Sequence, residues 1–327
     1  MKKISLIVPS YNEEENIKPF FEKCCKIFDG SGYYIEYIFV NDGSTDGTQE
    51  MLTNISNMIE DNVKNIISIE FSRNFGKEAA MLAGMEKCTG DYAVIIDADL
   101  QQDPKYVISM AEILDRKSDV DCIACKPAMR KESPIMIKFK KLFYKFINKI
   151  SEVKFEPDVS DFRMMRRNMI DAILNLKEYY RFSKGIFQWV GYKTEYILYD
   201  VNERHAGKTK WSFSNLIKYA IDGFVGFSTA PLRLASWVGV VGACISIIYF
   251  IIVFIQKVFG SGIDVSGYAT IVCLILLIGS IQMILIGIMG EYIARTYIEV
   301  KNRPRYVIKN IEVFNADNEH KGFEEKR

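Results

Sequence analysis

Two aspartates, Asp97 and Asp99, directly follow the apolar run of residues 93–96. In an extended backbone, side chains two residues apart point to the same side. Carboxylates held that close repel each other unless a cation compensates their charge. A small number of hard oxygen ligands, with positions left open for substrate phosphates, suits Mg²⁺ or Mn²⁺. The pair therefore predicts a divalent-metal site, and the alternative is a solvated turn after a strand.

The elements that would position this pair are short apolar runs alternating with helical patterns. The expected strands are residues 4–8, 37–40, 66–71, 92–96 and 122–124. The expected helices are residues 13–28, 46–59, 77–88 and 104–116. Asn12 and Asp103 are predicted to cap the first and the last of these helices. Such alternation predicts a mostly parallel sheet covered on both faces.

Polar residues follow four of these strands, at the point where each strand ends. They lie in residues 9–13, 41–48, 72–77 and 97–101. In parallel sheets of this kind, ligands bind beyond the carboxyl ends of the strands. The sequence therefore predicts one ligand site at this edge.

Two later stretches carry concentrated positive charge. Basic and apolar residues alternate over residues 127–158, which predicts a basic amphipathic helix that lies on an anionic bilayer or helps to bind a lipid phosphate. A solvated helix packed on the sheet is the alternative. A strand is expected near residues 159–165, a helix at 168–176 and another strand at 196–201. The basic loop that follows, residues 203–211, is expected to close over a diphosphate. Its Gly-Lys-Thr at residues 207–209 is not a P-loop, because Asn202 occupies the position of the first glycine.

Residues 234–255 and 269–290 contain no charged side chain. About 20 apolar residues are enough to cross the hydrocarbon core of a bilayer, so both segments are predicted to be transmembrane helices. A helical hairpin buried in a globular core is the alternative. Arg233 precedes the pair, and Arg295, Lys301 and Arg303 follow it. The positive-inside rule therefore places both termini and the N-terminal domain in the cytoplasm of a multi-pass cell-membrane protein.

These features predict the following organisation. The segments are a cytoplasmic catalytic domain at 1–211, interfacial helices at 212–233, the two spans, an outside loop at 256–268 and a cytoplasmic tail at 291–327 whose end, from Ala316, is expected to be disordered.

Composition excludes several classes of protein. A net charge of +1 gives no excess positive field for nucleic acid. Seven scattered cysteines and two histidines support neither a disulfide framework nor a zinc site, and they fit a reducing cytosolic face. No Gly-x-Gly-x-x-Gly follows the first strand, which argues against an NAD-binding enzyme.

Four motifs resemble the signatures of family 2 inverting glycosyltransferases of the GT-A fold. They are Val-Pro-Ser-Tyr-Asn-Glu-Glu at 8–14, Asn-Asp-Gly-Ser-Thr-Asp-Gly-Thr at 41–48, Arg-Asn-Phe-Gly-Lys at 73–77 and Asp-Ala-Asp-Leu-Gln at 97–101. Further motifs at 161–163, 189–192, 203–210 and 290–293 narrow the resemblance to the polyprenyl-phosphate glycosyltransferases, which include bactoprenol glucosyltransferases and dolichyl-phosphate mannose synthases. The resemblance covers residues 3–309.

The resemblance implies an α/β fold with a GT-A, Rossmann-like and mostly parallel sheet. It also implies inverting transfer of a single sugar from a nucleotide-sugar to a membrane polyprenyl phosphate such as undecaprenyl phosphate. UDP and a glucose-like sugar are the default donor. The product would be a lipid-linked sugar for cell-envelope glycosylation.

The same resemblance implies the roles of individual residues in the donor site. The expected nucleotide-sugar contacts are Pro9, Tyr11, Glu13, Asp42, Lys77, Asp97, Gln101, Arg204, Lys208 and Lys210. Asp99 would bind Mg²⁺ or Mn²⁺ on the diphosphate, where the metal neutralises charge on the leaving nucleotide. The basic loop would add positive charge to the same group.

An acceptor phosphate monoester is already anionic near neutral pH, so cations to position it are needed more than a strong base. Arg130, Lys131 and Arg163, together with Ser133, are expected to bind it. Asp161, with Asp97 and Arg163, is expected to be catalytic, either as a base or as an orienting acid. A purely structural pairing of Asp161 with Arg163 is the alternative.

Two other functions remain open. A processive polysaccharide synthase of the same fold typically carries Gln-x-x-Arg-Trp and more spans, and residues 187–189 do not match that spacing. A non-catalytic membrane scaffold would not need paired carboxylates. Membrane lipids, a second copy of the chain and a separate flippase are the further partners expected, with no nucleic acid.

Overall fold

An eight-stranded sheet organises the molecule. The computed structural model describes residues 1–56, 63–128, 144–145, 147–149, 151, 153–202, 228–259 and 267–315. The sheet has the order β7-β5-β6-β4-β1-β2-β3-β8. Its strands are β1 (Lys3–Ser10), β2 (Tyr34–Asn41), β3 (Val63–Phe71), β4 (Tyr92–Ile95), β5 (Cys122–Pro127), β6 (Arg163–Arg166), β7 (Thr194–Tyr199) and β8 (Ile308–Asn315). Strands β4, β1, β2 and β3 run parallel, as expected, whereas β6 and β8 pair antiparallel with their neighbours.

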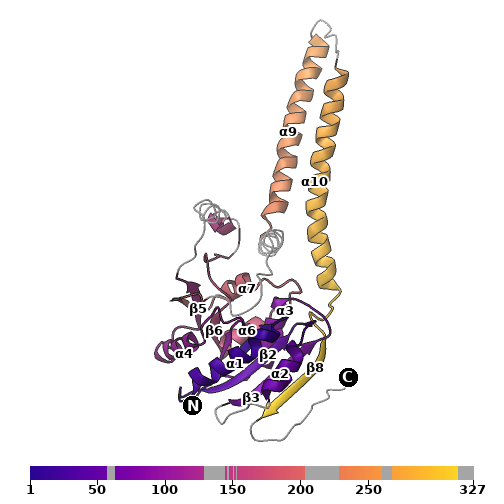
Figure 1. Cartoon of the computed structure of the whole chain (residues 1–327). Coiled ribbons are helices and arrows are strands. Elements are labelled where there is room, and N and C mark those ends of the chain that lie inside the picture. The colour runs from indigo at the N-terminus through magenta and orange to yellow at the C-terminus, as the bar shows by residue number, and fades with distance from the viewer. Residues whose placement is uncertain are drawn as a thin grey trace.

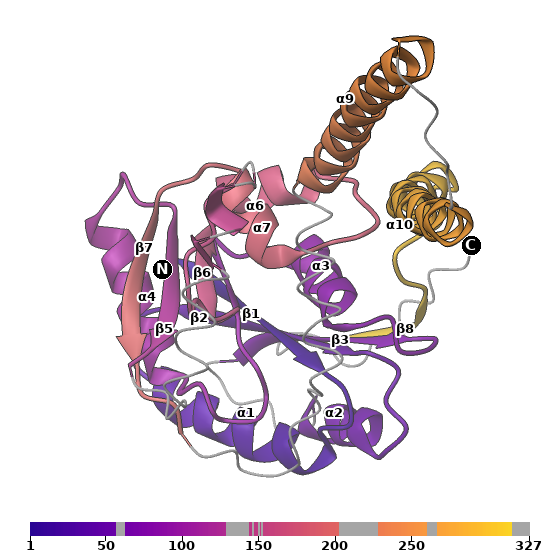
Figure 2. The ribbon, with the colours of Figure 1, turned by 90° about the horizontal axis from the view of Figure 1, so that it is seen from above.

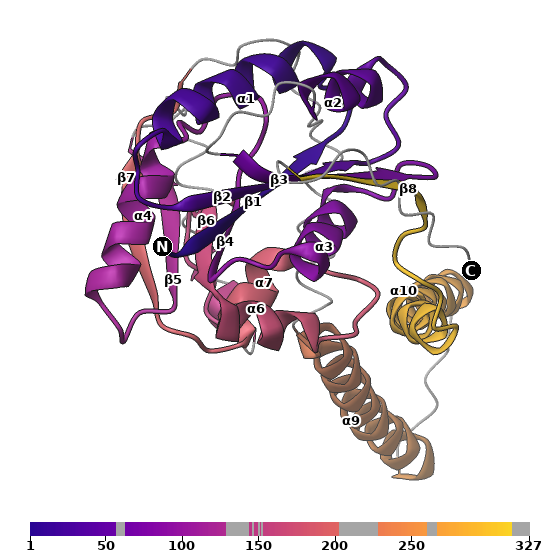
Figure 3. The ribbon, with the colours of Figure 1, turned by 90° about the horizontal axis from the view of Figure 1, so that it is seen from below.

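Helices cover both faces of the sheet in the described part of the chain (Figures 2 and 3). They are α1 (Glu14–Phe28), α2 (Thr48–Ser56), α3 (Lys77–Lys87), α4 (Lys105–Arg116), α6 (Arg167–Leu174) and α7 (Ser183–Trp189). Helices α1, α2 and α4 pack on one face, and α3, α6 and α7 pack on the other. The sequence patterns predicted all of these helices except α7.

The apolar character of β1 follows from its position in the centre of the sheet. Ile4, Leu6 and Val8 pack into the core beneath α1, while Ile7 packs into the core beneath α3. All four side chains are fully buried. A strand covered on both faces needs apolar residues at every position, which explains a continuous run in place of alternation.

The expected cap of α1 is wrong. Asn12 has a φ of +51°, and its Oδ1 accepts a hydrogen bond from the backbone N–H of Thr45 at 2.9 Å. Asn12 therefore ties the loop after β1 to the loop after β2. By contrast, the Asp103 carboxylate accepts a hydrogen bond from the N–H of Lys105 at the start of α4, at 3.1 Å.

Helices α9 (Ala230–Phe259) and α10 (Tyr268–Val300) extend side by side away from the sheet (Figure 1). Both are long and apolar enough to cross a membrane, over Ala230–Tyr249 and Leu274–Val300. They are longer than the predicted spans, and α9 begins inside the predicted interfacial segment, of which residues 212–227 lie outside the described part. Ile275 and Ile284 are 64% and 63% exposed, which contradicts a hairpin buried in a globular core.

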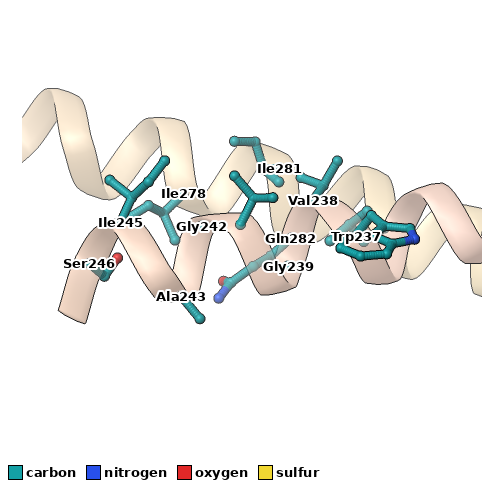
Figure 4. Close-up of a pocket in the computed structure, with 12 residues that line it drawn as sticks. Trp237, Val238, Gly239, Gly242, Ala243, Ile245, Ser246, Ile278, Ile281 and Gln282 are labelled. Atoms are coloured by element: carbon teal, nitrogen blue, oxygen red, sulfur yellow. The ribbon is translucent and has the colours of Figure 1, made fainter. Parts of the chain in front are cut away.

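Small and apolar residues of α9 and α10 line a groove of about 630 Å³ between the two helices (Figure 4). Gly239 and Gly242 lie on the α9 side, and Gln282 projects from α10. Small residues let helices approach closely in a bilayer. The groove therefore marks where the two candidate spans face each other.

Within the segment expected to be the C-terminal tail, residues 291–327, the structure describes a helix and a strand as far as Asn315. Helix α10 continues to Val300, and β8 then pairs antiparallel with β3. The physical reason is that β3 would otherwise present an unpaired edge of backbone N–H and C=O groups. Phe314 of β8 is buried in the core beneath α1 and α2.

Contacts at the end of α10 join the hairpin to the sheet. The N–H of Tyr179 donates to the Glu299 carboxylate at 2.9 Å, and Arg305 Nε donates to the carbonyl of Glu178 at 2.7 Å. The ring of Tyr306 stacks on Phe71 of β3, with ring centroids 4.8 Å apart. The sheet and the apolar hairpin are therefore connected by side-chain contacts as well as by the chain itself.

Candidate active site

A pocket of about 260 Å³ lies at the carboxyl ends of β1, β2 and β4. Its lining residues are Pro9, Ser10, Tyr11, Glu13, Asp42, Asn74, Gly76, Lys77, Ala80, Asp97, Ala98 and Asp99. The loops after four strands of the sheet contribute to it, as the sequence predicts. The structure thus brings together most of the residues expected to contact a nucleotide-sugar and the residue expected to bind a metal.

Lys77, the first residue of α3, reaches across the pocket to two carboxylates. Its Nζ lies 2.6 Å from Asp97 Oδ1 and 3.5 Å from Asp161 Oδ2. Burial by itself lowers the pKa of Lys77, but the attraction of Asp97 and Asp161 outweighs burial and raises it. The ammonium group therefore stays charged and links the pocket to Asp161.

The geometry of the two aspartates differs from the expected extended arrangement. Strand β4 ends at Ile95, and residues 98–99 form a turn. Asp97 turns toward Lys77, and its position is fixed by Gln102, whose Oε1 accepts from the N–H of Asp97 at 3.1 Å and whose Nε2 donates to Asp97 Oδ2 at 3.3 Å. Repulsion between the carboxylates is therefore relieved partly by Lys77 and partly by the turn.

Asp99, the residue expected to bind a metal ion, lines the pocket beside Asp97, which is paired with Lys77. It is 6% exposed, and its Oδ1 accepts from the N–H of Gln101 at 3.1 Å. Leu100, next in the chain, has a φ of +61°, which residues other than glycine rarely adopt. Such backbone conformations are concentrated at functional sites. The backbone is thus held in an unusual form where Asp99 lines the pocket.

The donor set fits a metal that shares its coordination with substrate. Among the residues that the structure describes, no group of three or more His, Cys, Asp or Glu side chains is arranged to hold a metal ion. Mg²⁺ is commonly bound through one or two carboxylates plus substrate phosphates. Asp99 beside an open pocket is that kind of site.

Asp42 organises the pocket wall at the end of β2. It is 3% exposed, and its carboxylate accepts hydrogen bonds from the N–H groups of Phe75, at 2.6 Å, and Gly76, at 2.9 Å. Burial raises the pKa of Asp42, and these two donors oppose that effect in part. Asp42 therefore holds the loop before α3 in place while lining the pocket.

The same two loops approach too closely for a side chain at Gly43. This residue has a φ of +63°, and a Cβ there would lie 2.3 Å from the backbone carbon of Arg73. The glycine of the Asn-Asp-Gly motif is therefore required by a contact between backbones.

Arg163, expected to bind the lipid phosphate, lies buried at the start of β6. It is 2% exposed, its guanidinium lies 3.8 Å from the ring centroid of Phe187, and it donates to the carbonyl of Ser160 at 3.1 Å. Its expected contact with a lipid phosphate stays a prediction.

Asp161 pairs with Lys77 in preference to Arg163. Burial raises the pKa of Asp161, but nearby positive charges, above all that of Lys77, outweigh burial and lower it. Its Oδ1 is buried and has no hydrogen-bond donor among the described residues. The ionised carboxylate of Asp161 thus lies beside the pocket, and its Oδ1 accepts no hydrogen bond from the described residues.

Several predicted site residues lie outside the described part of the chain. They are Arg130, Lys131, Ser133, Arg204, Lys208 and Lys210, together with most of the predicted basic amphipathic helix. Their assigned contacts stay predictions. Gln101 is described, but it is not among the residues that line the pocket.

Sequence reasoning missed Gln102, Ser10 and Asn74. Gln102 adjoins the Asp-Ala-Asp-Leu-Gln motif, and its burial at 6% exposure is unusual for a glutamine. Its position beside the motif was the available signal, but the sequence could not show which of two neighbouring glutamines faces Asp97.

Two family models match the chain. Glycosyl transferase family 2 matches residues 5–174, and the model described as GtrB C-terminal hairpin matches residues 230–296. The first covers the strands and loops that form the pocket, and the second covers the α9–α10 hairpin.

Similar proteins match over nearly their whole length. The putative glycosyltransferase CsbB of Bacillus subtilis is 40% identical over 96% of this chain and 93% of its own length. The prophage bactoprenol glucosyl transferase homolog of Escherichia coli is 40% identical over 94% and 99%. The bactoprenol glucosyl transferase of Shigella phage SfII is 40% identical over 94% and 97%.

Among solved structures, glucosyl-3-phosphoglycerate synthase from Mycobacterium tuberculosis is 16% identical. It aligns with a TM-score of 0.46 over 67% of this chain and 76% of its own. The family model and the long relatives at 40% identity carry the assignment: the chain belongs to glycosyl transferase family 2 and is a glycosyltransferase.

Proposed function

We propose that the chain transfers one glucose from UDP-glucose to a membrane polyprenyl phosphate such as undecaprenyl phosphate, and that this yields a lipid-linked sugar for the cell envelope. One observation supports the proposal. The pocket lined by Lys77, Asp97 and Asp99 and two helices of membrane-spanning length belong to a single chain. That chain is 40% identical, over nearly its whole length, to proteins named bactoprenol glucosyl transferase.

The reaction exchanges one bond at the anomeric carbon of the sugar. A phosphate oxygen of the lipid forms a bond to that carbon, the bond to the UDP oxygen breaks, and its electron pair leaves with UDP. A divalent metal held by Asp99 supplies Lewis-acid stabilisation of the leaving diphosphate when bound. Attack from the face opposite UDP inverts the configuration.

Residues of the chain itself hold the donor in place. Asp42 and the loop that it fixes form one wall of the proposed nucleotide site, with Tyr11 and Glu13 on the β1 side. Lys77 adds positive charge close to the expected diphosphate. Arg204, Lys208 and Lys210 are proposed to close over that group.

Asp161 serves the acceptor end of the site in this proposal. The lipid phosphate is already largely ionised near neutral pH, so Asp161 need not remove a proton for the oxygen to attack. We assign it to positioning the Lys77 ammonium group, because an ionised carboxylate only accepts hydrogen bonds and the ionised phosphate offers it no donor. Arg130, Lys131 and Ser133 are proposed to bind the phosphate from the membrane side.

The proposed topology puts the catalytic domain and both termini in the cytoplasm, where nucleotide-sugars are available. The spans are α9 and α10, which are apolar over the lengths given above. Homo-oligomerisation through the glycine-lined groove and delivery of the product to a separate flippase are further proposals.

The test is transfer by the purified full chain in detergent. Radiolabelled UDP-glucose is supplied with undecaprenyl phosphate, with undecaprenol or with no lipid. The proposal expects label in the lipid phase with the phosphate alone, and loss of that label in Asp161→Asn. Equal transfer to undecaprenol, or label in water-soluble polymer, contradicts it.

A further inference from the structure

The start of α7 is fixed by a carboxylate that lies outside the donor pocket. Both carboxylate oxygens of Glu78 lie 3.2 Å from the backbone nitrogen of Ser183 and accept its N–H. The Ser183 hydroxyl also donates to Glu78 Oε2 in a short hydrogen bond. Ser183 is 3% exposed. Glu78 therefore joins the first turn of α3 to the first residue of α7.

Helix α7 in turn supports the segment that carries Asp161. Phe187 of α7 lies beneath the Arg163 guanidinium, which donates to the carbonyl of Ser160. The positive charge of Lys184, also on α7, contributes to lowering the pKa of Asp161. Asp161 thus depends on α7 both for packing and for its electrostatic surroundings.

Two sets of contacts connect α3 with the segment that carries Asp161. Lys77 contacts Asp161 directly, the next residue, Glu78, contacts Ser183, and α7 returns to the Asp161 segment through Phe187. Two neighbouring residues of α3 therefore set the position of Asp161 by two independent routes.

We propose that Glu78 is a positioning residue for sugar transfer, which acts through Ser183 and α7 to hold Asp161 at its distance from Lys77. The expected kinetic effect rests on the proposed function, whereas the contact between Glu78 and Ser183 does not depend on it. Glu78 is not among the residues that line the donor pocket, so its effect is expected on turnover and not on donor binding.

The charge environment of Glu78 adds a pH signature. Burial raises its pKa to about 7, the hydrogen bonds from Ser183 oppose that rise, and the negative charge of Asp161 adds to it while Arg181 counteracts it. Lys77 and Arg181 remain protonated near neutral pH, and the lowered pKa of Asp161 keeps it ionised there. Protonation of Glu78 removes acceptor capacity from the contact with Ser183.

The experiment combines kinetics with hydrogen exchange on the full chain in detergent. For Glu78→Ala we expect kcat to fall by about tenfold or more, KM for UDP-glucose to stay near its original value, and amides of residues 183–187 to exchange faster. Glu78→Gln keeps one carbonyl acceptor, so it should lose less kcat and should lack the component of activity that rises through about pH 7.

The matched control is Glu86→Ala. Glu86 lies on the same helix and accepts a hydrogen bond from the hydroxyl of Tyr306, away from Asp161. It should change neither kcat nor exchange in α7. Unchanged kcat or unchanged α7 exchange in Glu78→Ala overturns the inference, as does a loss confined to KM. If the unmodified chain transfers no sugar, the proposed function fails, while the exchange measurement still decides whether Glu78 fixes α7.

Discussion

The ammonium group of Lys77 lies between Asp97 and Asp161, 2.6 Å from the first carboxylate and 3.5 Å from the second. One cation thereby joins the donor pocket to the carboxylate assigned to the acceptor. Lys77, at the start of α3, reaches both carboxylates because the loop after β4 and the loop before β6 meet at this edge of the sheet.

Replacing Lys77 by methionine should remove that link. Asp161 then loses the strongest of the positive charges that lower its pKa, so burial raises the pKa and less of the carboxylate is ionised. We expect a large loss of kcat and a shift of the acid limb of the pH–activity profile to higher pH. Lys87→Met, at the other end of α3, is the control, and an unshifted acid limb in Lys77→Met contradicts the role.

The same pair predicts how stability depends on pH. The folded-state pKa of Asp161 is lowered, so its contribution is present above the unfolded-state pKa of about 3.9 and is lost as pH falls through the folded value. The difference in unfolding free energy between the unmodified chain and Lys77→Met should therefore be largest near neutral pH and shrink below about pH 4. Denaturant titrations at several pH values measure it, and a constant difference argues against the pairing.

Asp99→Asn should abolish the stimulation of activity by Mg²⁺ or Mn²⁺ while leaving the fold intact. A neutral amide is a much weaker ligand for a hard cation than a carboxylate. Mn²⁺ binding in the presence of UDP, followed by electron paramagnetic resonance, reports the site without turnover. Asp119→Asn, at an exposed turn, is the control, and full metal-stimulated turnover by Asp99→Asn rules out the metal assignment.

Asp42→Asn should weaken both the pocket and the fold. Asparagine can keep its oxygen as the acceptor for the N–H of Phe75, but its amide nitrogen then faces the N–H of Gly76, so one buried hydrogen bond is lost. We expect the free energy of unfolding to fall by about 1–3 kcal/mol and the affinity for UDP to fall as well. Chemical denaturation and calorimetric UDP binding measure the two effects, and a variant with unchanged affinity for UDP removes Asp42 from the nucleotide site.

Phe314→Ala tests the return of the chain to the sheet. The ring is 9% exposed and packs into the core beneath α1 and α2, so its removal should destabilise the domain that contains the sheet by about 3 kcal/mol. Asn310→Ala, an exposed position on the same strand, should change stability little. Equal stability of the two variants would show that β8 does not dock on β3 in solution.

The sequence predicted the central sheet well because its strands are buried on both faces and read as continuous apolar runs, as at Ile4 to Val8. It predicted the pocket because strands β1 to β4 end in polar motifs at one edge. Strand β8 was missed because its stability comes from pairing with β3, more than 230 residues away in the chain, and an eight-residue segment carries no mark of that partner.

The side-chain arrangement within the site was harder to predict. Asp161 and Arg163 are two residues apart, which suggested a pair, but Arg163 turns into the core onto Phe187 while Asp161 faces Lys77. Gln101 and Gln102 differ in the same way, because the turn after Asp97 decides which of them faces the aspartate. Spacing along the chain does not fix such orientations once the backbone leaves the strand.

The central claim is transfer of one sugar to a lipid phosphate, and mass spectrometry of the lipid product tests it most directly. The purified chain is incubated with UDP-glucose, undecaprenyl phosphate and Mg²⁺, and the lipid fraction is analysed beside that from Asp99→Asn. We predict undecaprenyl phosphate carrying a single hexose, absent from the variant. Lipid bearing several hexoses, or unmodified lipid with every nucleotide-sugar supplied, would contradict the account.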